Sequence, residues 1–286
     1  MKNTDIRVAP IAGALGAEVH GVNLAEPMDD ATFEQMQQAF LEHCVLFFRD
    51  QDINPEQHKR FASRFGTLNI HPFIAGLPEH PEVMEFVKEP NESGYNVGGT
   101  WHSDTTFLAE PALGSLLYAH EVPPYGGDTI FANMYLAYET LSPAMQRMLE
   151  GLRAIHSAAN SYGKGGNFDR NQGKGQAAMS IDIDSEQISE VSHPVVRTHP
   201  QTGRKALYVN PNFTRRFDGM TEAESQPLLD FLYAHQQKPE FTCRFSWQRH
   251  SLAFWDNRCT QHLAVNDYDG FRRRMHRVTI DGDRPH

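Results

Sequence analysis

The sequence predicts a mainly β protein with a few peripheral helices, folded as a sandwich or jelly roll. Short runs of alternating or wholly apolar residues recur along the 286 residues, as expected for strands. Few segments show helical spacing, which favours a sandwich or jelly roll over a parallel sheet. No internal repeat or Pro- or Ser-rich linker divides the chain, so we expect a single domain over 1–286.

The composition limits the possible functions. With 40% hydrophobic residues the chain can bury a sizeable core, and its formal net charge of −10 argues against general affinity for nucleic acid or an anionic membrane. Cys44, Cys243 and Cys259 fit no disulfide framework, which predicts a reducing compartment. No apolar stretch reaches the roughly 18 residues of a membrane span, and no signal core follows the start. We expect a soluble cytoplasmic protein.

The first third of the chain contains strand and helix patterns in turn. Residues 6–23 predict short strands, and 45–48 predict a buried strand. Apolar residues at helical spacing predict a helix from an N-cap at Asp30 to about His43. A capping box, a proline at the first helical position and a terminal glycine predict a second helix over 54–66.

The middle of the chain predicts loops, strands and one helix. Prolines and glycine turns make 67–99 loop-rich, whereas 113–120 and 128–131 have strand patterns and 142–149 has a helical one. A long, glycine-rich connection without periodicity follows, around 157–190. Such a connection is usually functional or mobile, so it is either a lid over the site or a surface insertion.

The last third predicts a hairpin, a helix and the closing strands. A Thr-Gly turn divides the hairpin over 195–210. Thr221 and Glu224 form a second capping box, and the helix that it opens would bury Leu229 and Phe231. The remaining strands are expected at 241–247, 251–255 and 275–280.

One short motif, Trp101-His102-Ser103-Asp104, is a candidate metal site. In an extended strand, the side chains of His102 and Asp104 point to the same face and can bind one ion. His262, which follows a strand and a turn-like segment, is the candidate third ligand. Two histidines and one carboxylate on one face of a metal form the ligand set of non-haem Fe(II) oxygenases.

Two arginines near the end of the chain strengthen this interpretation. Arg273 and Arg277 are four residues apart, so a strand would place both on one face. Two inward guanidiniums beside a metal are costly unless each meets an anion. A dicarboxylate co-substrate and an anionic substrate would supply these anions.

Four segments together resemble the taurine dioxygenase-like Fe(II)/2-oxoglutarate-dependent dioxygenases, whose relatives include phenoxyalkanoate dioxygenases and alkylsulfatases. These segments are 101–104, 126–129, 255–262 and 273–277, and the resemblance extends over nearly the whole chain. It implies a double-stranded β-helix, the jelly roll also found in cupins. It further implies Fe(II), 2-oxoglutarate and O2 as cofactor and co-substrates, and a homo-oligomer, either a dimer or a tetramer.

The resemblance also implies roles for individual residues. The iron ligands would be His102, Asp104 and His262. Thr129 and Arg273 would hold the distal carboxylate of 2-oxoglutarate, for which a guanidinium fork is well suited. Arg277 would lie near the acidic group of the substrate or assist the co-substrate. The expected reaction hydroxylates a small organic anion and cleaves the product, with release of succinate and CO2.

Two further residues are candidates for the substrate pocket, and the resemblance indicates the first of them, His71. His71 matches a substrate-contacting histidine, with an ordinary surface group as the alternative, and Phe213 lines the pocket or only packs in the core. Taurine enzymes carry Asn and Tyr where this chain has Gly98 and Ile74. The pocket should therefore be roomier and more apolar, which favours a sulfonate, sulfate ester or aryloxy acid other than taurine.

Two other classes of protein remain possible from the residues alone. A Zn(II) hydrolase could use the same three ligands and a metal-bound water, but Thr129 and Arg273 would then have no dicarboxylate to bind. A non-catalytic jelly-roll binding protein would contain the histidines as hydrogen-bonded core groups.

Overall fold

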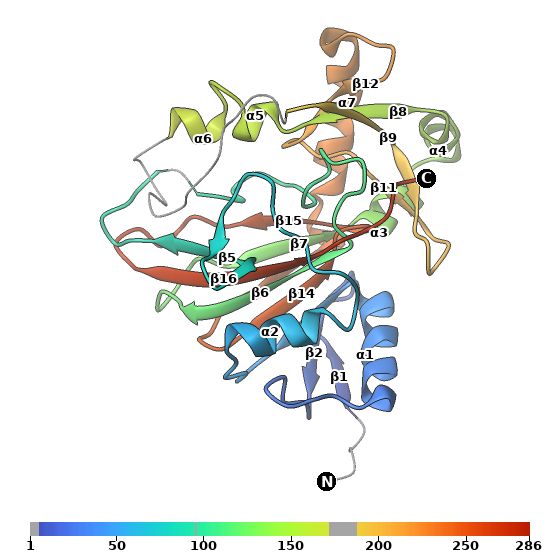
Figure 1. Cartoon of the computed structure of the whole chain (residues 1–286). Coiled ribbons are helices and arrows are strands. Elements are labelled where there is room, and N and C mark those ends of the chain that lie inside the picture. The colour runs from blue at the N-terminus through green and yellow to red at the C-terminus, as the bar shows by residue number, and fades with distance from the viewer. Residues whose placement is uncertain (1–5, 95, 172–187) are drawn as a thin grey trace.

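The computed structural model describes residues 6–94, 96–171 and 188–286. Its centre is an eight-stranded sheet in which only the β2–β3 pair is parallel (Figure 1). The strand order across this sheet is β1 (Arg7–Pro10), β2 (Ala17–His20), β3 (Val45–Phe48), β14 (Leu252–Asp256), β6 (Gly114–Glu121), β16 (Arg273–Ile280), β5 (His80–Lys88) and β4 (Gly76–Leu77).

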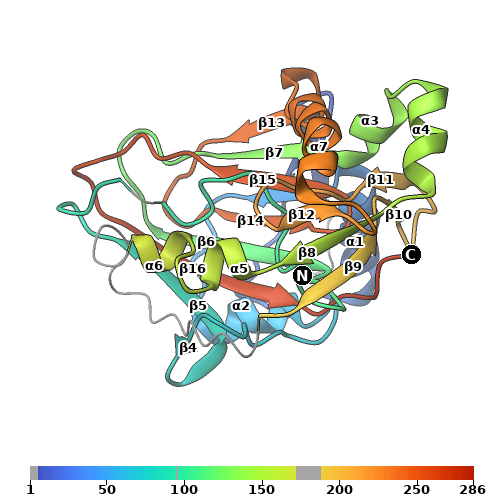
Figure 2. The ribbon, with the colours of Figure 1, turned by 90° about the horizontal axis from the view of Figure 1, so that it is seen from above.

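Within the described ranges, three smaller sheets complete the β structure (Figure 2). The sheet that packs against the large one contains β13 (Thr242–Phe245), β7 (Thr129–Asn133) and β15 (Thr260–Ala264). Contacts between rings join the two sheets: Phe47 stacks on Phe245 at 4.1 Å, and Trp255 lies 4.7 Å from His262. The others contain β12 (Thr214–Phe217), β8 (Arg153–Ser157) and β9 (Glu190–Pro194), and β10 (Val196–Thr198) and β11 (Lys205–Leu207).

Both faces of the large sheet are buried, because alternate residues of its strands enter two different cores. Phe47 and Trp255 belong to the core between the sheets, whereas Phe48 and Phe254 belong to the core beneath the helices α1 (Asp30–His43) and α2 (Pro55–Ala62). On that second face, Phe40 of α1 stacks on Phe254 with a centroid separation of 3.9 Å. Residues of the inner core, among them Phe86 and Trp255, line a cavity.

The remaining helices of the described residues lie around the smaller sheets. They are α3 (Met134–Glu139), α4 (Pro143–Glu150), α5 (Ala159–Tyr162), α6 (Asn167–Arg170), α7 (Glu222–Gln236) and the 3-10 helix η2 (Pro239–Phe241). Figure 1 shows α5 and α6 on the opposite side of the large sheet from α1 and α2. The mainly β prediction with peripheral helices is confirmed.

Several element boundaries differ from the sequence predictions. The capping box at Asn54 is present, but α2 ends at Ala62 because residues 63–65 form a turn before Gly66. The N-cap of α1 is Asp29, one residue before the expected position. Phe231 of α7 is 47% exposed rather than buried, because α7 packs on one side only.

The expectation of a loop-rich 67–99 was wrong for residues 76–88, which form β4 and the nine-residue β5 on either side of a short turn. Pro81 is the second residue of β5, a position where a strand tolerates proline. From Val83 onward the strand contributes apolar side chains to both cores, with Val83 in the helix-covered core and Phe86 in the inner core. The other prolines of this segment lie in bends and turns outside the strands.

The three cysteines are free and buried. Within the described ranges, the helices are all too short or too polar to cross a membrane.

Candidate active site

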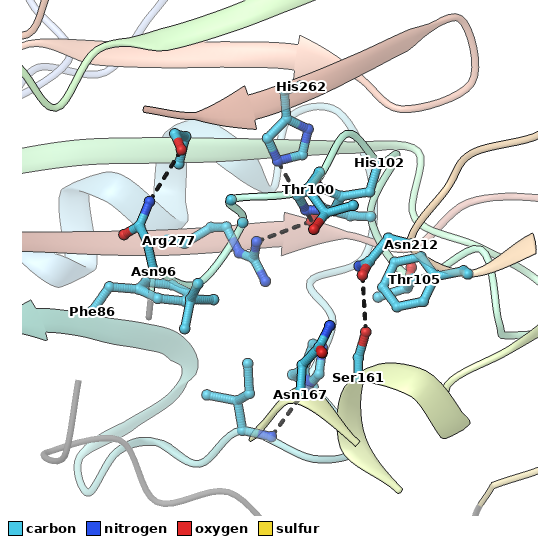
Figure 3. A pocket seen from close by; sticks show the side chains of 18 of the residues that line it. Phe86, Asn96, Thr100, His102, Thr105, Ser161, Asn167, Asn212, His262 and Arg277 are labelled. Carbon is cyan, nitrogen blue, oxygen red and sulfur yellow. Dashed lines mark hydrogen bonds and ion pairs between the residues drawn. The ribbon is translucent and has the colours of Figure 1, made fainter. Parts of the chain in front are cut away.

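The structure brings His102, Asp104 and His262 together at the end of the space between the sheets. Backbone hydrogen bonds join the two histidines reciprocally: His102 N–H donates to His262 (3.1 Å) and His262 N–H to His102 (2.8 Å). Their rings lie 4.2 Å apart, and Asp104 Oδ1 is 3.8 Å from Nε2 of His102 and 3.9 Å from Nε2 of His262. Figure 3 shows both imidazoles facing the cavity.

The His-x-Asp pair does not lie in a strand as the sequence suggested. His102 forms a single β-bridge, and Asp104 begins a turn in which Thr105 has a φ of 51°. The turn, not strand alternation, brings the carboxylate towards the imidazoles. Strand β15, which contains His262, was also not predicted.

A hydrogen bond to the backbone orients the imidazole of His102. His102 Nδ1 lies 2.7 Å from the carbonyl of Thr100, which can only accept, so Nδ1 carries the hydrogen and Nε2 presents its lone pair. Burial lowers the pKa of His102 and that of His262. Both imidazoles are therefore neutral, the form in which histidine binds metals.

The carboxylate of Asp104 is held from two sides. Ser115 Oγ donates to Oδ2 (2.7 Å), and Asn257 Nδ2 also donates to Oδ2 (3.3 Å) while its Oδ1 accepts the backbone N–H of Asp104 (3.0 Å). Burial alone would raise the pKa of Asp104, but the charge of Arg277 and the hydrogen bond from Ser115 hold this pKa well below its usual value. Oδ1 is thus the oxygen that faces the histidines, and it is ionised.

The sequence did not indicate Ser115 as a residue of the site. Ser115 lies in β6, between apolar neighbours. A small polar residue within a mostly apolar strand pattern is the feature of the sequence that could have indicated its role.

Thr129 and Arg273 line the same cavity. The guanidinium of Arg273 is buried, and its Nε and Nη2 have no hydrogen-bond partner among the described residues. Such a group is costly to bury unless an anion pairs with it. Thr129 Oγ1 accepts a hydrogen bond from Trp247 Nε1 (3.0 Å). The pair therefore suits a carboxylate, which can accept from both side chains.

The three residues expected at the substrate pocket, His71, Arg277 and Phe213, also line this cavity. Nδ1 of His71 accepts from the backbone N–H groups of Phe73 and Ile74, both at 3.1 Å, so the ring hydrogen is on Nε2. Burial, together with the charge of Arg277, lowers the pKa of His71 to about 3. His71 is therefore a neutral donor, buried rather than on the surface.

Gly98 and Ile74 line the cavity as well. Gly98 has a φ of 79°, so the backbone itself favours glycine at this position. Ile74 is buried in the inner core. Both positions are apolar in the cavity wall, as expected.

Part of the segment expected to be a lid reaches the cavity. The ring of Tyr162 in α5 stacks on that of Phe73 at 4.8 Å and on that of Phe168 in α6 at 5.0 Å. Tyr162 and Phe168 line the cavity. In Figure 3, Ser161, Asn167 and Asn212 lie on the side away from Arg277 and His262. Residues 172–187 lie outside the described ranges, so the lid stays a prediction.

A second group of metal-ligand types lies nearby, formed by His199, Asp256 and Cys259. In this group, both carboxylate oxygens of Asp256 already have hydrogen-bond partners. Arg258 donates to Oδ1 (2.8 Å) and to Oδ2 (2.6 Å), and His199 Nε2 lies 3.0 Å from Oδ2. This group is an ion-paired network that holds the turn before β15.

Fold and site together define the class of protein, and comparison with known proteins bears this out: the chain is a 2-oxoglutarate-dependent dioxygenase. The model of the family described as "Taurine catabolism dioxygenase TauD, TfdA family" matches residues 7–279, and the chain belongs to this family. The resemblance and the jelly-roll fold inferred from the sequence are confirmed. The zinc hydrolase and binding-protein alternatives are not supported.

The chain is similar to relatives along nearly its whole length. It is 35% identical to the alkylsulfatase of Acinetobacter baylyi, over 97% of this chain and 86% of the relative. It is 32% identical to an alpha-ketoglutarate-dependent sulfate ester dioxygenase of Pseudomonas putida, over 98% and 91%.

Two solved structures have the same fold. A taurine dioxygenase from Burkholderia xenovorans matches with a TM-score of 0.81 and 36% identity, over 99% of this chain and 91% of the other. AAD-2 in complex with Mn(II) and N-oxalylglycine matches with a TM-score of 0.80 and 31% identity, over 99% of each chain.

Proposed function

We propose that this protein is an Fe(II)-dependent enzyme that uses 2-oxoglutarate and O2 to hydroxylate a small organic anion. The observation that carries the proposal is the convergence of two neutral imidazoles and an ionised carboxylate oxygen, all within 4.8 Å of one another. Two nitrogens and one oxygen on one side of an ion fit non-haem Fe(II). When bound, the iron and 2-oxoglutarate together activate O2, and 2-oxoglutarate is converted to succinate and CO2.

In this proposal His102, Asp104 and His262 hold the iron through Nε2, Oδ1 and Nε2. Ser115 and Asn257 occupy the other oxygen of Asp104, so the carboxylate presents one atom to the metal. A ligand that is oriented by hydrogen bonds binds metal more tightly than one that must be ordered on binding.

Arg273 and Thr129 hold the distal carboxylate of 2-oxoglutarate. The unpaired Nε and Nη2 of Arg273 supply two parallel donors, and the Thr129 hydroxyl supplies a third. Their burial excludes water, which strengthens the charge pairing in the site.

Arg277 and His71 bind the anionic group of the substrate. A charged and a neutral donor face one cavity whose wall also contains apolar side chains, among them Phe86, Leu117 and Phe213. This combination suits a sulfate ester, a sulfonate or an aryloxy acid. Hydroxylation of the carbon that bears the ester or ether oxygen gives an unstable product, which loses sulfate or the aryl alcohol and leaves a carbonyl.

A substrate panel with Fe(II) tests the proposal. We expect anaerobic addition of 2-oxoglutarate to the Fe(II) protein to give a weak visible charge-transfer band, and succinate to form in air with at least one sulfate ester, sulfonate or aryloxy acid. Zn(II) in place of Fe(II), or Asp104→Ala, should abolish both signals. Absence of the band in wild type, or turnover with Zn(II) without oxygen, would overturn the proposal.

We also expect a cytoplasmic homo-oligomer, a dimer or a tetramer, that binds neither nucleic acid nor membrane. Light scattering of the purified chain measures the oligomeric state directly, and a monomer at micromolar concentration would contradict this expectation.

A further inference from the structure

We propose that Trp247 is a positioning residue for the co-substrate, because it directs the hydroxyl hydrogen of Thr129 and flanks the guanidinium of Arg273. This inference rests on the proposed function, in which Thr129 and Arg273 hold the distal carboxylate of 2-oxoglutarate. Trp247 does not touch the reacting atoms and would act only through these two side chains.

Trp247 follows β13, the strand that pairs with β7. In this register Phe245 lies opposite Thr129, so the chain leaving β13 places Trp247 beside the start of β7. The side chain of Trp247 is buried, and its Nε1 lies 3.0 Å from Thr129 Oγ1. The ring is held further by an edge contact with Phe245 at 5.0 Å.

The direction of this hydrogen bond follows from the chemistry of its two groups. An indole nitrogen can only donate, so Thr129 must be the acceptor. The single hydroxyl hydrogen of Thr129 then points elsewhere, and among the described residues no acceptor is paired with it. The Thr129 hydroxyl can therefore donate its hydrogen to a ligand. A carboxylate accepts hydrogen bonds and needs such a donor. Without Trp247, the hydroxyl could rotate and present a lone pair to the carboxylate instead.

The same indole faces the arginine. The guanidinium carbon of Arg273 lies 5.9 Å from the ring centroid of Trp247 and 5.9 Å from that of Tyr268. Tyr268 is itself fixed, since Lys88 Nζ lies 4.3 Å from its ring and its hydroxyl is 3.5 Å from Asn96 Oδ1. Two rings thus flank Arg273, which reduces the rotamer freedom it would lose on binding the carboxylate.

The alternative is that Trp247 only fills space in the core. Trp247→Phe separates the two roles, because phenylalanine keeps an aromatic ring beside Arg273 but lacks the N–H group. The matched variant is Thr129→Val, which keeps the shape of the threonine and removes its hydroxyl. Thermal unfolding curves measure any loss of folding in each variant.

The test uses two 2-oxo acids that differ at the distal end. Binding of 2-oxoglutarate and of 2-oxovalerate, which lacks the distal carboxylate, is measured by calorimetry on the Mn(II)-loaded protein. We expect Trp247→Phe to weaken 2-oxoglutarate binding about tenfold, the size of one lost hydrogen bond, with 2-oxovalerate unchanged. The double variant Trp247→Phe/Thr129→Val should bind 2-oxoglutarate no more weakly than Thr129→Val alone.

Other outcomes would contradict the proposal. An equal loss for both acids, no loss for either, or fully additive losses in the double variant would mean that Trp247 only packs. If Mn(II)-loaded wild type fails to bind 2-oxoglutarate, the proposed function itself is wrong. The two failures are thus distinguishable in one experiment.

Discussion

Arg277 donates a hydrogen bond from Nη1 to Oδ1 of Asp104 at 3.0 Å. This is the carboxylate oxygen that faces both histidines. The charge of Arg277 keeps Asp104 ionised in spite of burial, so a residue proposed to bind the substrate also prepares the metal ligand. Metal binding and substrate binding are therefore expected to depend on each other through this pair.

Replacing Arg277 should impair both functions. Arg277→Ala is expected to raise KM for the primary substrate at least about tenfold, since a buried anion loses its charged partner. It should also weaken Mn(II) binding, because Asp104 loses a countercharge. Substrate-dependent succinate formation and Mn(II) titration measure the two effects. A change in the 2-oxoglutarate requirement alone would instead assign Arg277 to the co-substrate.

Ser115→Ala should weaken metal binding without removing a ligand. Oδ2 of Asp104 loses its 2.7 Å hydrogen bond, and loss of such a supporting partner typically costs about 10- to 100-fold in metal affinity. Mn(II) binding followed by electron paramagnetic resonance measures this. The matched control is Ser103→Ala, a buried serine whose hydroxyl donates to the Thr260 carbonyl instead. Equal losses in the two variants would show a general packing effect.

Arg273→Ala should strongly raise the concentration of 2-oxoglutarate needed for half-maximal turnover. Truncating one partner of a buried charge pair costs about 2–5 kcal/mol, or roughly 30- to 5000-fold. Arg273→Lys should recover only part of this, because an ammonium lacks the planar fork. The measurement is succinate formation against co-substrate concentration at saturating primary substrate. If the half-maximal concentration does not move, another basic residue holds the co-substrate.

His58 of α2 should make folding sensitive to acid. Its Nε2 is buried and has no partner among the described residues. Burial, aided by His276 and His120, lowers its pKa from 6.5 to about 3. Between these values the unfolded chain binds more protons than the folded protein, so stability falls as pH decreases below 6.5.

The free energy of unfolding should fall by about 1.4 kcal/mol between pH 7.5 and 5.5 from His58 alone. Urea midpoints of the wild type and of His58→Phe at the two pH values measure this, and the variant should lose less stability on acidification. Other buried histidines, such as His193 with a pKa of about 4, add to the wild-type slope. Identical slopes in the two proteins would mean that His58 does not titrate.

Much of the fold was predictable from local patterns. The capping boxes at Asn54 and Thr221 begin α2 and α7 as expected, because an N-cap needs only residues within one turn of each other. The strand β5 was missed, because prolines near its start masked the apolar run that follows. Propensity describes neighbours in the chain, whereas β5 forms because it pairs with β16, almost 190 residues away.

By itself, the sequence determined the chemistry that this protein has available: two imidazoles, a carboxylate, a hydroxyl and two guanidiniums in recognisable motifs. Only the tertiary structure decided how their atoms meet. It placed Asp104 on a turn instead of a strand, Ser115 behind its second oxygen, and Trp247 against Thr129. The reason is physical: side-chain chemistry and periodicity are local properties, but the hydrogen bond between Trp247 and Thr129 joins residues 118 positions apart and depends on which strands pair.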